Sequence, residues 1–334
     1  MQVLREFESH RLRQMGCFSD VRSHSTNLHG RYWEVRFLPR HSNCLNGRLF
    51  SKPVLLTPAN HDRDTAGMTY VYPVVSRRAG GVSVGVNLNP NNACNWACVY
   101  CQVPDLVRGT APPIDLAQLE SELRAMLHAI VHGDFMQTQV PQDMRRLNDI
   151  ALSGNGEPTS AREFAAVIEL IGALLAEFEL LGKIKLVLIT NGSLIDRKPV
   201  QAGLRAMAGL NGEVWFKLDS ATAAGMRTVN QTRIAPDKAF ERLGISAALC
   251  PTWLQTCVFA LDGLAPSDAE QQAYLQLVHR IQREQIPVQG VLLYGLARPS
   301  MQPQALRLSA LPPAWLEDFA QRIRAAGLLV QVSV

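Results

Sequence analysis

The sequence predicts an α/β protein built on a parallel sheet, and three observations carry that prediction. The chain has 334 residues, 47% of them hydrophobic and 19% charged, so it can bury a large core. From residue 82 onward, short apolar runs alternate with amphipathic helical segments, which is typical of parallel strands joined by helical crossovers. Counting from that point gives six strand–helix units and one terminal strand.

Residues 1–80 are expected to form an N-terminal, β-rich cap or extension, and residues 81–334 the main domain. Within the cap, residues 31–38 and 68–75 are strand-like, and clusters of Gly, Pro, Asn and Asp separate them. The cap carries 12 Lys and Arg against 6 Asp and Glu, whereas the rest of the chain carries 21 against 23. Such a basic segment fits either contact with a phosphate-rich partner or an ordinary solvated face.

The main domain follows a regular order of strands and helices. Strands are expected at residues 82–88, 149–153, 184–190, 213–219, 254–260, 288–294 and 328–332. Helices are expected at residues 114–132, 163–178, 198–210, 236–243, 267–285 and 314–326. Asp115 stands near the start of the first helix, where a carboxylate can cap free amides. In such sheets the site lies at the carboxyl ends of the strands.

Composition also bears on the compartment. The chain contains no run of eighteen apolar residues, so no membrane span is expected. Its first eight residues include two acids and no apolar core like that of a signal peptide. The seven cysteines show no disulfide framework, and three of them are spaced like metal ligands. A reducing, cytoplasmic location is therefore expected.

Three cysteines form the strongest motif of the chain. Cys94, Cys98 and Cys101 have C-x₃-C-x₂-C spacing and directly follow the strand expected at residues 82–88. Short, unequal gaps let three sulfurs converge on one inorganic group, and a [4Fe–4S] cluster takes cysteine thiolates as ligands. Three thiolates would hold three irons and leave the fourth open to a ligand that is not protein.

Two other interpretations of this motif stay open at this point. One is a zinc site lacking its fourth ligand, and the other is a set of reduced core thiols. Structural zinc favours four ligands, typically in paired C-x₂₋₄-C units. A second pair is missing, because the other four cysteines stand apart: Cys17, Cys44, Cys250 and Cys257.

The cysteine spacing, with Tyr100 just before the last cysteine, resembles the signature of the radical S-adenosylmethionine (radical SAM) enzymes. The resemblance extends over about residues 82–295 and implies a partial (β/α)₆ TIM-type barrel. It implies a [4Fe–4S] cluster on the three cysteines, with S-adenosylmethionine on the open iron. It also implies cleavage of that cofactor to a 5′-deoxyadenosyl radical, hydrogen abstraction from a substrate, and a reductant such as flavodoxin or ferredoxin.

A glycine-rich loop follows the strand at residues 149–153. Gly154 and Gly156 lack a Cβ and permit close backbone approach, and Glu157 at the end of the loop can bind an ammonium group. The loop resembles the Gly-Gly-Glu-type loop that holds the cofactor's methionine amine in radical SAM enzymes, with Asn155 between the glycines. An ordinary strand–helix turn is the alternative.

Further candidates end the next two strands. Thr190 and Asn191 precede a glycine in a common turn sequence, and in the resembling enzymes this strand end contacts the cofactor or shapes its pocket. Asp219 is a pocket residue by the same resemblance. Lys217 shares a strand face with Asp219 and is a candidate for contact with cofactor or substrate. The sequence identifies no catalytic acid or base.

The substrate is left open between several classes. Residues 153–159 are similar to the Gly-Glu-Pro turn of the radical SAM enzymes that build the tricyclic wyosine base of transfer RNA. Those enzymes hold a second cluster on upstream cysteines, where this chain has Cys17 and Cys44. RNA modification is one expectation, and a small metabolite or peptide is another. A different class of function is a catalytically silent iron–sulfur or zinc protein that contacts nucleic acid through its basic N-terminal segment.

Overall fold

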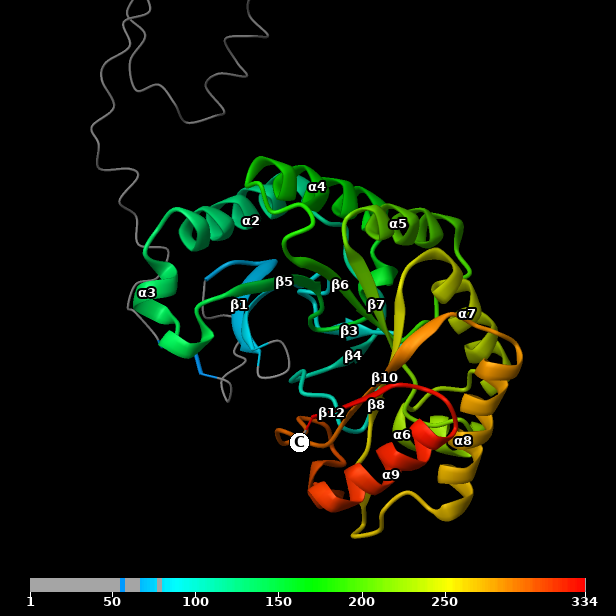
Figure 1. Ribbon diagram of the computed structural model, residues 1–334. Helices are drawn as coiled ribbons and strands as arrows, with labels where there is room; N and C mark the ends of the chain where they lie inside the picture. The colour runs from blue at the N-terminus through cyan, green and yellow to red at the C-terminus, as the bar shows by residue number, and fades with distance from the viewer. Residues whose placement is uncertain (1–54, 58–66, 77–79, 334) are drawn as a thin grey trace, which may run out of the picture. The chain divides into compact units, whose positions relative to one another are not determined.

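Eight strands form one curved sheet, with helices along its outer face (Figure 1). The computed structural model describes residues 55–57, 67–76 and 80–333, all within one compact unit that spans residues 49–334. In spatial order, the strands are β1 (Val71–Ser76), β2 (Gly81–Val86), β5 (Leu147–Leu152), β6 (Lys185–Thr190), β7 (Gly212–Lys217), β8 (Thr252–Cys257), β10 (Val288–Tyr294) and β12 (Val330–Ser333).

The strand pairing confirms the predicted partial barrel. From β2 to β12 every neighbouring pair is parallel and follows the order of the chain. Among the described strands the pairing ends at β1 and β12, so the barrel is not closed. β1, which overlaps the strand expected at residues 68–75, pairs antiparallel with β2 and extends the sheet. The other strand expected in the cap, residues 31–38, lies outside the described residues.

Six helices make the crossovers between successive parallel strands (Figure 1). They are α2 (Leu116–Val131), α4 (Phe164–Glu177), α5 (Lys198–Gly209), α7 (Pro236–Leu249), α8 (Asp268–Arg283) and α9 (Pro313–Ala325). The predicted cap of the first helix is confirmed, because the Asp115 side chain accepts a 3.0 Å hydrogen bond from the Gln118 amide. α7 is longer than expected: Gly244 and Ser246 weaken its apolar period, yet the helix continues because Ser246 and Ala247 are buried.

Several short elements were not predicted. The most consequential is α6 (Ala223–Val229), a seven-residue helix between the strand expected at residues 213–219 and the helix expected at 236–243. Two-residue strands β3 (Ala93–Cys94) and β4 (Val107–Arg108) pair with each other beside the cysteine motif. The remaining short elements are α3 (Phe135–Gln139), η1 (Gln142–Met144), η2 (Pro158–Ser160), η3 (Ala305–Arg307), β9 (Ala260–Leu261) and β11 (Leu308–Ser309).

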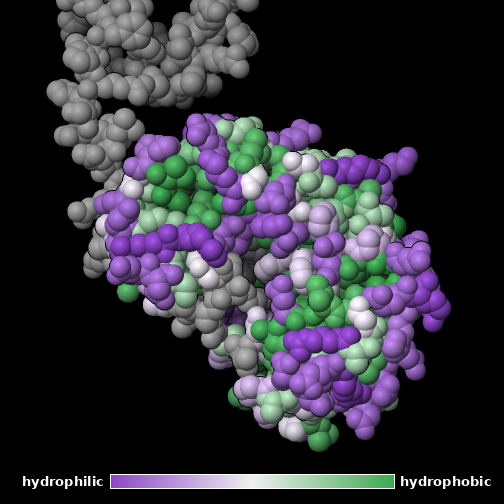
Figure 2. All heavy atoms as spheres, viewed as in Figure 1, coloured by the Kyte–Doolittle hydropathy of each residue, from purple (hydrophilic) through white to green (hydrophobic). Residues whose placement is uncertain are grey.

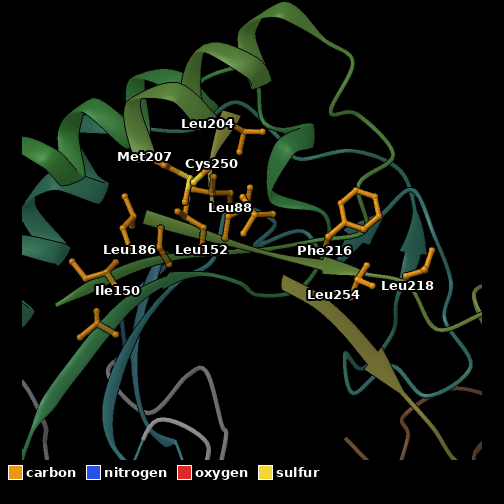
Figure 3. Packing of buried hydrophobic residues seen from close by; sticks show 14 of the residues in the cluster. Leu88, Ile150, Leu152, Leu186, Leu204, Met207, Phe216, Leu218, Cys250 and Leu254 are labelled. Atoms are coloured by element: carbon orange, nitrogen blue, oxygen red, sulfur yellow. The ribbon is translucent and has the colours of Figure 1, made fainter. Parts of the chain in front are cut away.

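The two faces of the sheet carry different side chains, because successive residues of a strand point to opposite faces. The outer face is apolar and packs against the helices, as Figure 3 shows for Ile150, Leu186 and Phe216. The inner face carries the alternating residues, among them Asp149 and Lys217, and these line a cavity. The main hydrophobic core therefore lies between the sheet and its helices rather than inside the barrel.

The outer surface is mixed in polarity. Figure 2 shows hydrophilic residues spread over the view, with smaller apolar patches between them. Among the described residues, no helix combines the length and hydrophobicity needed to cross a bilayer.

Candidate functional site

A cavity of about 680 Å³ lies on the inner side of the curved sheet. Its walls are inward-facing side chains of β1, β2, β5, β6, β7, β8 and β10, together with the loops that follow β2, β3, β5, β6 and β10. Most of the predicted site residues line it: Cys94, Cys98, Tyr100, Cys101, Gly154, Asn155, Gly156, Glu157 and Asn191. Thr190 and Asp219 are not in the lining, and both instead hydrogen-bond to residues that are.

The cysteine loop, residues 94–101, brings all three thiols to this cavity. It begins at the end of β3, whose pairing with β4 closes the base of the loop. The Cys101 amide donates a 3.0 Å bond to the Cys98 carbonyl, which forms a turn between the last two cysteines. All three are free thiols of intermediate exposure. One short loop therefore presents three thiol donors to a single space.

Segments far away in the chain hold the cysteine loop from outside. The C-terminal end of α6 accepts its amides: Val99 N donates to the Val229 carbonyl at 2.9 Å. From the other side, Ser300 Oγ donates 2.7 Å to the Val99 carbonyl, and Gln302 Nε2 donates 3.2 Å to the Cys101 carbonyl. The end of α6 and the segment after β10 thus fix the loop, and no sequence signal predicts these contacts.

Burial changes the acidity of two of the cysteines. It raises the pKa of the Cys94 thiol to about 12, with Glu157 adding to the effect. Burial likewise raises the pKa of Cys98 to about 12, and the Asp219 carboxylate contributes in the same direction. These thiols therefore stay protonated until a metal displaces their protons, since the thiolate is the metal ligand.

The donor set fits a cluster better than a single ion. Within the described part of the chain, no group of three or more His, Cys, Asp or Glu side chains is placed to hold one metal ion. A tetrahedral zinc site needs four ligands converging on one point. In an iron–sulfur cluster each thiolate binds a different iron, so three thiols that line one cavity suit it.

The glycine-rich loop packs against the loop that leads to the cysteines. A Cβ on Gly154, whose φ is 156°, would lie 2.3 Å from Asn87 Oδ1, and one on Gly156 would lie 2.1 Å from the Ala93 carbonyl oxygen. Asn155 adds a 2.6 Å bond from its Nδ2 to Asn92 Oδ1. The tight approach that needs glycine is therefore to the protein's own β2–β3 connection, while the loop also lines the cavity.

Glu157 joins the ends of β5 and β6. Its Oε1 accepts bonds from the hydroxyls of Thr159 and Thr190, both at 2.6 Å, and from the Thr159 amide at 3.1 Å. Its Oε2 accepts one bond, from the Asn191 amide at 2.7 Å. Burial raises the pKa of Glu157, while these four donors favour its charged form. Because a carboxylate oxygen can accept more than one bond, Oε2 retains capacity for a further donor.

Asn191 connects this group to the cysteine loop. Its Nδ2 donates 2.8 Å to Asn95 Oδ1, and Asn95 in turn donates 2.7 Å to Ser193 Oγ. The Ser193 amide returns a 3.0 Å bond to Asn191 Oδ1. Because Asn95 lies directly after Cys94, the end of β6 and the first cysteine are fixed relative to each other.

Asp219 forms a second network, on the opposite side of the cysteine loop. Its Oδ2 accepts 2.6 Å bonds from the Tyr100 hydroxyl and from Asn230 Nδ2, and its Oδ1 accepts a 2.8 Å bond from the Cys257 amide. Lys217 Nζ lies 3.4 Å from the Tyr100 hydroxyl and 5.3 Å from the centre of its ring. Asp219 therefore acts behind the cavity wall, by holding Tyr100 in place.

Deeper in the cavity the inner face carries further polar groups. Ser83 donates a hydrogen bond to the buried Asp149, whose pKa burial raises to about 6. Tyr72 of β1 lies over Gly85 and bonds Ser153 at 2.9 Å, so a strand of the expected cap contributes to the wall. The buried Gln255 Oε1 has no hydrogen-bond partner among the described residues. The alternation of inward-facing and outward-facing residues along each strand was the one sequence feature that could have placed these residues inside the barrel.

Comparisons with known proteins show the fold. No family model matches the sequence. A radical SAM methyltransferase from Sphaerobacter thermophilus superposes with a TM-score of 0.50 at 14% identity, over 79% of this chain and 68% of that one. The chain has the fold of the radical SAM enzymes. SuiB of Streptococcus suis gives a TM-score of 0.49 at 12% identity, over 77% of this chain and 50% of that one. TYW1 with a lysine–pyruvate adduct bound gives 0.47 at 13% identity, over 74% of each chain.

Two curated proteins are similar in sequence over 160 residues, 48% of this chain. The UPF0026 protein MJ1312 of Methanocaldococcus jannaschii is 29% identical, and 43% of its length is covered. The GTPase Obg of Brachyspira hyodysenteriae is 23% identical, and 21% of its length is covered. The match thus takes in less than half of either relative.

Proposed function

We propose that this protein is a radical SAM enzyme, with a [4Fe–4S] cluster bound by Cys94, Cys98 and Cys101. The observation that carries the proposal is the convergence of three thiols, from one eight-residue loop, on the inner cavity of a radical SAM-type barrel. When bound, the cluster supplies the electron that cleaves S-adenosylmethionine to a 5′-deoxyadenosyl radical, which abstracts hydrogen from a substrate.

The residues around the cysteine loop are suited to bind S-adenosylmethionine. Glu157 would bind the cofactor's amine through Oε2, which has acceptor capacity left beside its bond from the Asn191 amide. Gly154, Asn155 and Gly156 offer backbone along the cavity wall, and Asn191 and Tyr100 complete the surroundings. Thr190 and Asp219 support this set from behind, through Glu157 and Tyr100 respectively.

Lys217 is suited to hold an anionic group of cofactor or substrate. Its ammonium lies among the phenols of Tyr100 and Tyr294, at 3.4 and 3.3 Å from their oxygens, and faces the cavity. Burial lowers its pKa, but Tyr294 and the Asp219 carboxylate outweigh that effect and raise the pKa overall. Lys217 is therefore assigned a binding role as a cation, and no role as a base.

The proposal also covers the electron donor and the substrate. The reaction needs a one-electron reductant, and a flavodoxin or ferredoxin in the cytoplasm fits this need. Residues 1–80 are proposed as a cap, and their excess of basic residues supports RNA as one substrate class. Activity on transfer RNA, compared with small metabolites and peptides, tests this part separately from the cofactor chemistry.

A silent binding protein is the competing function. Its zinc form would need a fourth ligand beside the three cysteines of the motif. The name of the GTPase relative supports no proposal for this chain. A phosphate-binding loop of the form G-x-x-x-x-G-K-[ST] is absent from the sequence, where Gly182-Lys183 is followed by Ile184.

Single replacement of each motif cysteine by Ala tests the assignment of the ligands. Protein reconstituted with iron and sulfide without oxygen should hold about four irons per chain. Each of the three variants should lose most of this iron, because one ligand is missing. Cys250→Ala is the matched control, since Cys250 is a buried thiol in the hydrophobic core between sheet and helices. Unchanged iron in the motif variants, or equal loss in the control, would contradict the proposal.

A further inference from the structure

Asn230 lies where the cysteine loop meets α6. It ends α6, is almost fully buried, and donates from Nδ2 to two acceptors: Cys98 Sγ at 3.3 Å and Asp219 Oδ2 at 2.6 Å. A side-chain amide nitrogen carries two hydrogens, so both bonds form at once. The Asn230 carbonyl also accepts the Ala97 amide, at 3.4 Å. One residue thus contacts the loop through both its backbone and its side chain.

The chemistry of Asp219 fixes which way this amide faces. A carboxylate only accepts hydrogen bonds, so the nitrogen of the amide, and not its oxygen, must face Asp219. The carboxylate itself is held by the Tyr100 hydroxyl at 2.6 Å and by the Cys257 amide at 2.8 Å. The same nitrogen therefore also faces Cys98, and its second hydrogen is directed at the sulfur. In the reverse orientation, the amide oxygen would meet both a carboxylate and a thiolate.

We propose that Asn230 is a positioning residue that raises the reduction potential of the cluster, through its N–H···S bond to Cys98. This inference rests on the proposed function, because it assumes that Cys98 binds the cluster. Reduction adds negative charge that is shared with the sulfur ligands, and hydrogen bonds to those sulfurs are one of the factors that set the potential. The amide also stands between Cys98 and the Asp219 carboxylate, whose charge opposes reduction.

The test measures the reduction potential of the reconstituted cluster in Asn230→Leu. Leucine has a similar volume and donates no hydrogen bond. At an applied potential equal to the wild-type midpoint, the ratio of reduced to oxidised cluster, followed by electron paramagnetic resonance, should fall about tenfold. For one electron this is a midpoint about 59 mV more negative. A general loosening of the loop does not predict this direction of change.

Gln302→Met is the matched control. Gln302 Nε2 also holds the cysteine loop, but it donates to the carbonyl oxygens of Cys101 and Val103 and to no sulfur. Its replacement should leave the potential unchanged. An equal shift in this control would overturn the inference, because loop geometry rather than the N–H···S bond would then set the potential.

The outcomes separate the inference from the function on which it rests. Wild-type protein that takes up no iron overturns the proposed function, and the inference with it. Full iron content in Asn230→Leu with the wild-type potential overturns the inference alone. Should this variant hold too little iron to titrate, Asn230→Ser carries the same comparison, because its hydroxyl is too short to replace the amide at both acceptors.

Discussion

On β7, successive residues point to opposite faces of the sheet. Val214 and Phe216 face the helices and are fully buried in the hydrophobic core, whereas Trp215 and Lys217 line the cavity. The outward pair belongs to the hydrophobic core between sheet and helices, and Figure 3 shows Phe216 among the labelled core residues. The inward pair stands among tyrosines, carboxylates and cysteines. The outer face of the sheet is built for stability, and the inner face places chemical groups at some cost to stability.

The cost is visible in groups of the inner face that the fold leaves incompletely satisfied. Gln255 Oε1 is buried without a partner among the described residues. Asp149 is a buried carboxylate to which Ser83 alone donates a hydrogen bond in the described part of the chain. A buried polar group without enough partners costs free energy of folding. Such groups are expected where a protein binds a ligand that supplies the missing partners.

The largest expected difference between the faces is in the effect of removing an aromatic ring. Phe216→Ala should lower the free energy of unfolding by about 3–5 kcal/mol, because it opens a cavity in a packed core beside Gly192. Trp215→Ala, one residue away, should cost less although the ring is larger, because that side chain already borders open space. Chemical denaturation of both variants measures this. Equal losses would contradict the distinction between the two faces.

Asp149→Asn should raise the free energy of unfolding, whereas the two aromatic replacements lower it. The pKa of Asp149 is raised from 3.8 to about 6, so the fold favours the protonated acid. The stability that Asp149 contributes is present below about pH 4 and is lost as the pH rises through about 6. The size of this loss is about 3 kcal/mol for a shift of about two pKa units. The Asn variant avoids it and should gain on the wild type by that amount between about pH 4 and pH 8.

Denaturation at both pH values checks the Asp149 prediction. Asp143→Asn, which changes an exposed carboxylate just before β5, should show no such gain. An Asp149→Asn protein that gains nothing over the wild type at the higher pH would show that this carboxylate is well satisfied in the folded protein.

The smallest of these effects concerns Glu157, a buried residue that also lines the cavity. Glu157→Gln removes the negative charge and can place an amide nitrogen at Oε2, the oxygen proposed to accept the cofactor's amine, so a charge-assisted bond is lost. Binding of S-adenosylmethionine should weaken by about 1–3 kcal/mol, measured by calorimetry on reconstituted protein. Thr190→Val keeps the carboxylate, removes one donor to it, and should weaken binding less. Unchanged affinity in Glu157→Gln would mean that this loop is only a turn.

The sequence predicted the parallel sheet and its crossovers well, because apolar periodicity reports directly on burial. It also placed the three cysteines and Glu157 around one cavity, since spacing and strand order determine which loops share an edge of the sheet. α6 was missed because seven residues carry too little periodicity to be recognised. The bond from Asn230, at the end of this helix, to Cys98 was missed for the same reason.

The supports of the cysteine loop could not be predicted for a different reason. Ser300 and Gln302 bond carbonyls about two hundred residues earlier in the chain. Ordinary polar residues in a loop carry no local mark of such partners, because the contact depends on how the whole barrel brings its ends together. The roles of Tyr72 and Asp149 were missed likewise, since their positions inside the barrel follow from strand pairing.

The most direct test of the central claim is the release of 5′-deoxyadenosine by the purified protein. Protein reconstituted without oxygen would be mixed with dithionite and S-adenosylmethionine, and the product followed by chromatography, with Cys98→Ala as the blank. The account predicts about four irons per chain and slow release of 5′-deoxyadenosine, with none above background in the variant. About eight irons would indicate a second cluster. Bound zinc in place of iron, with no release, would contradict the account and leave a binding protein.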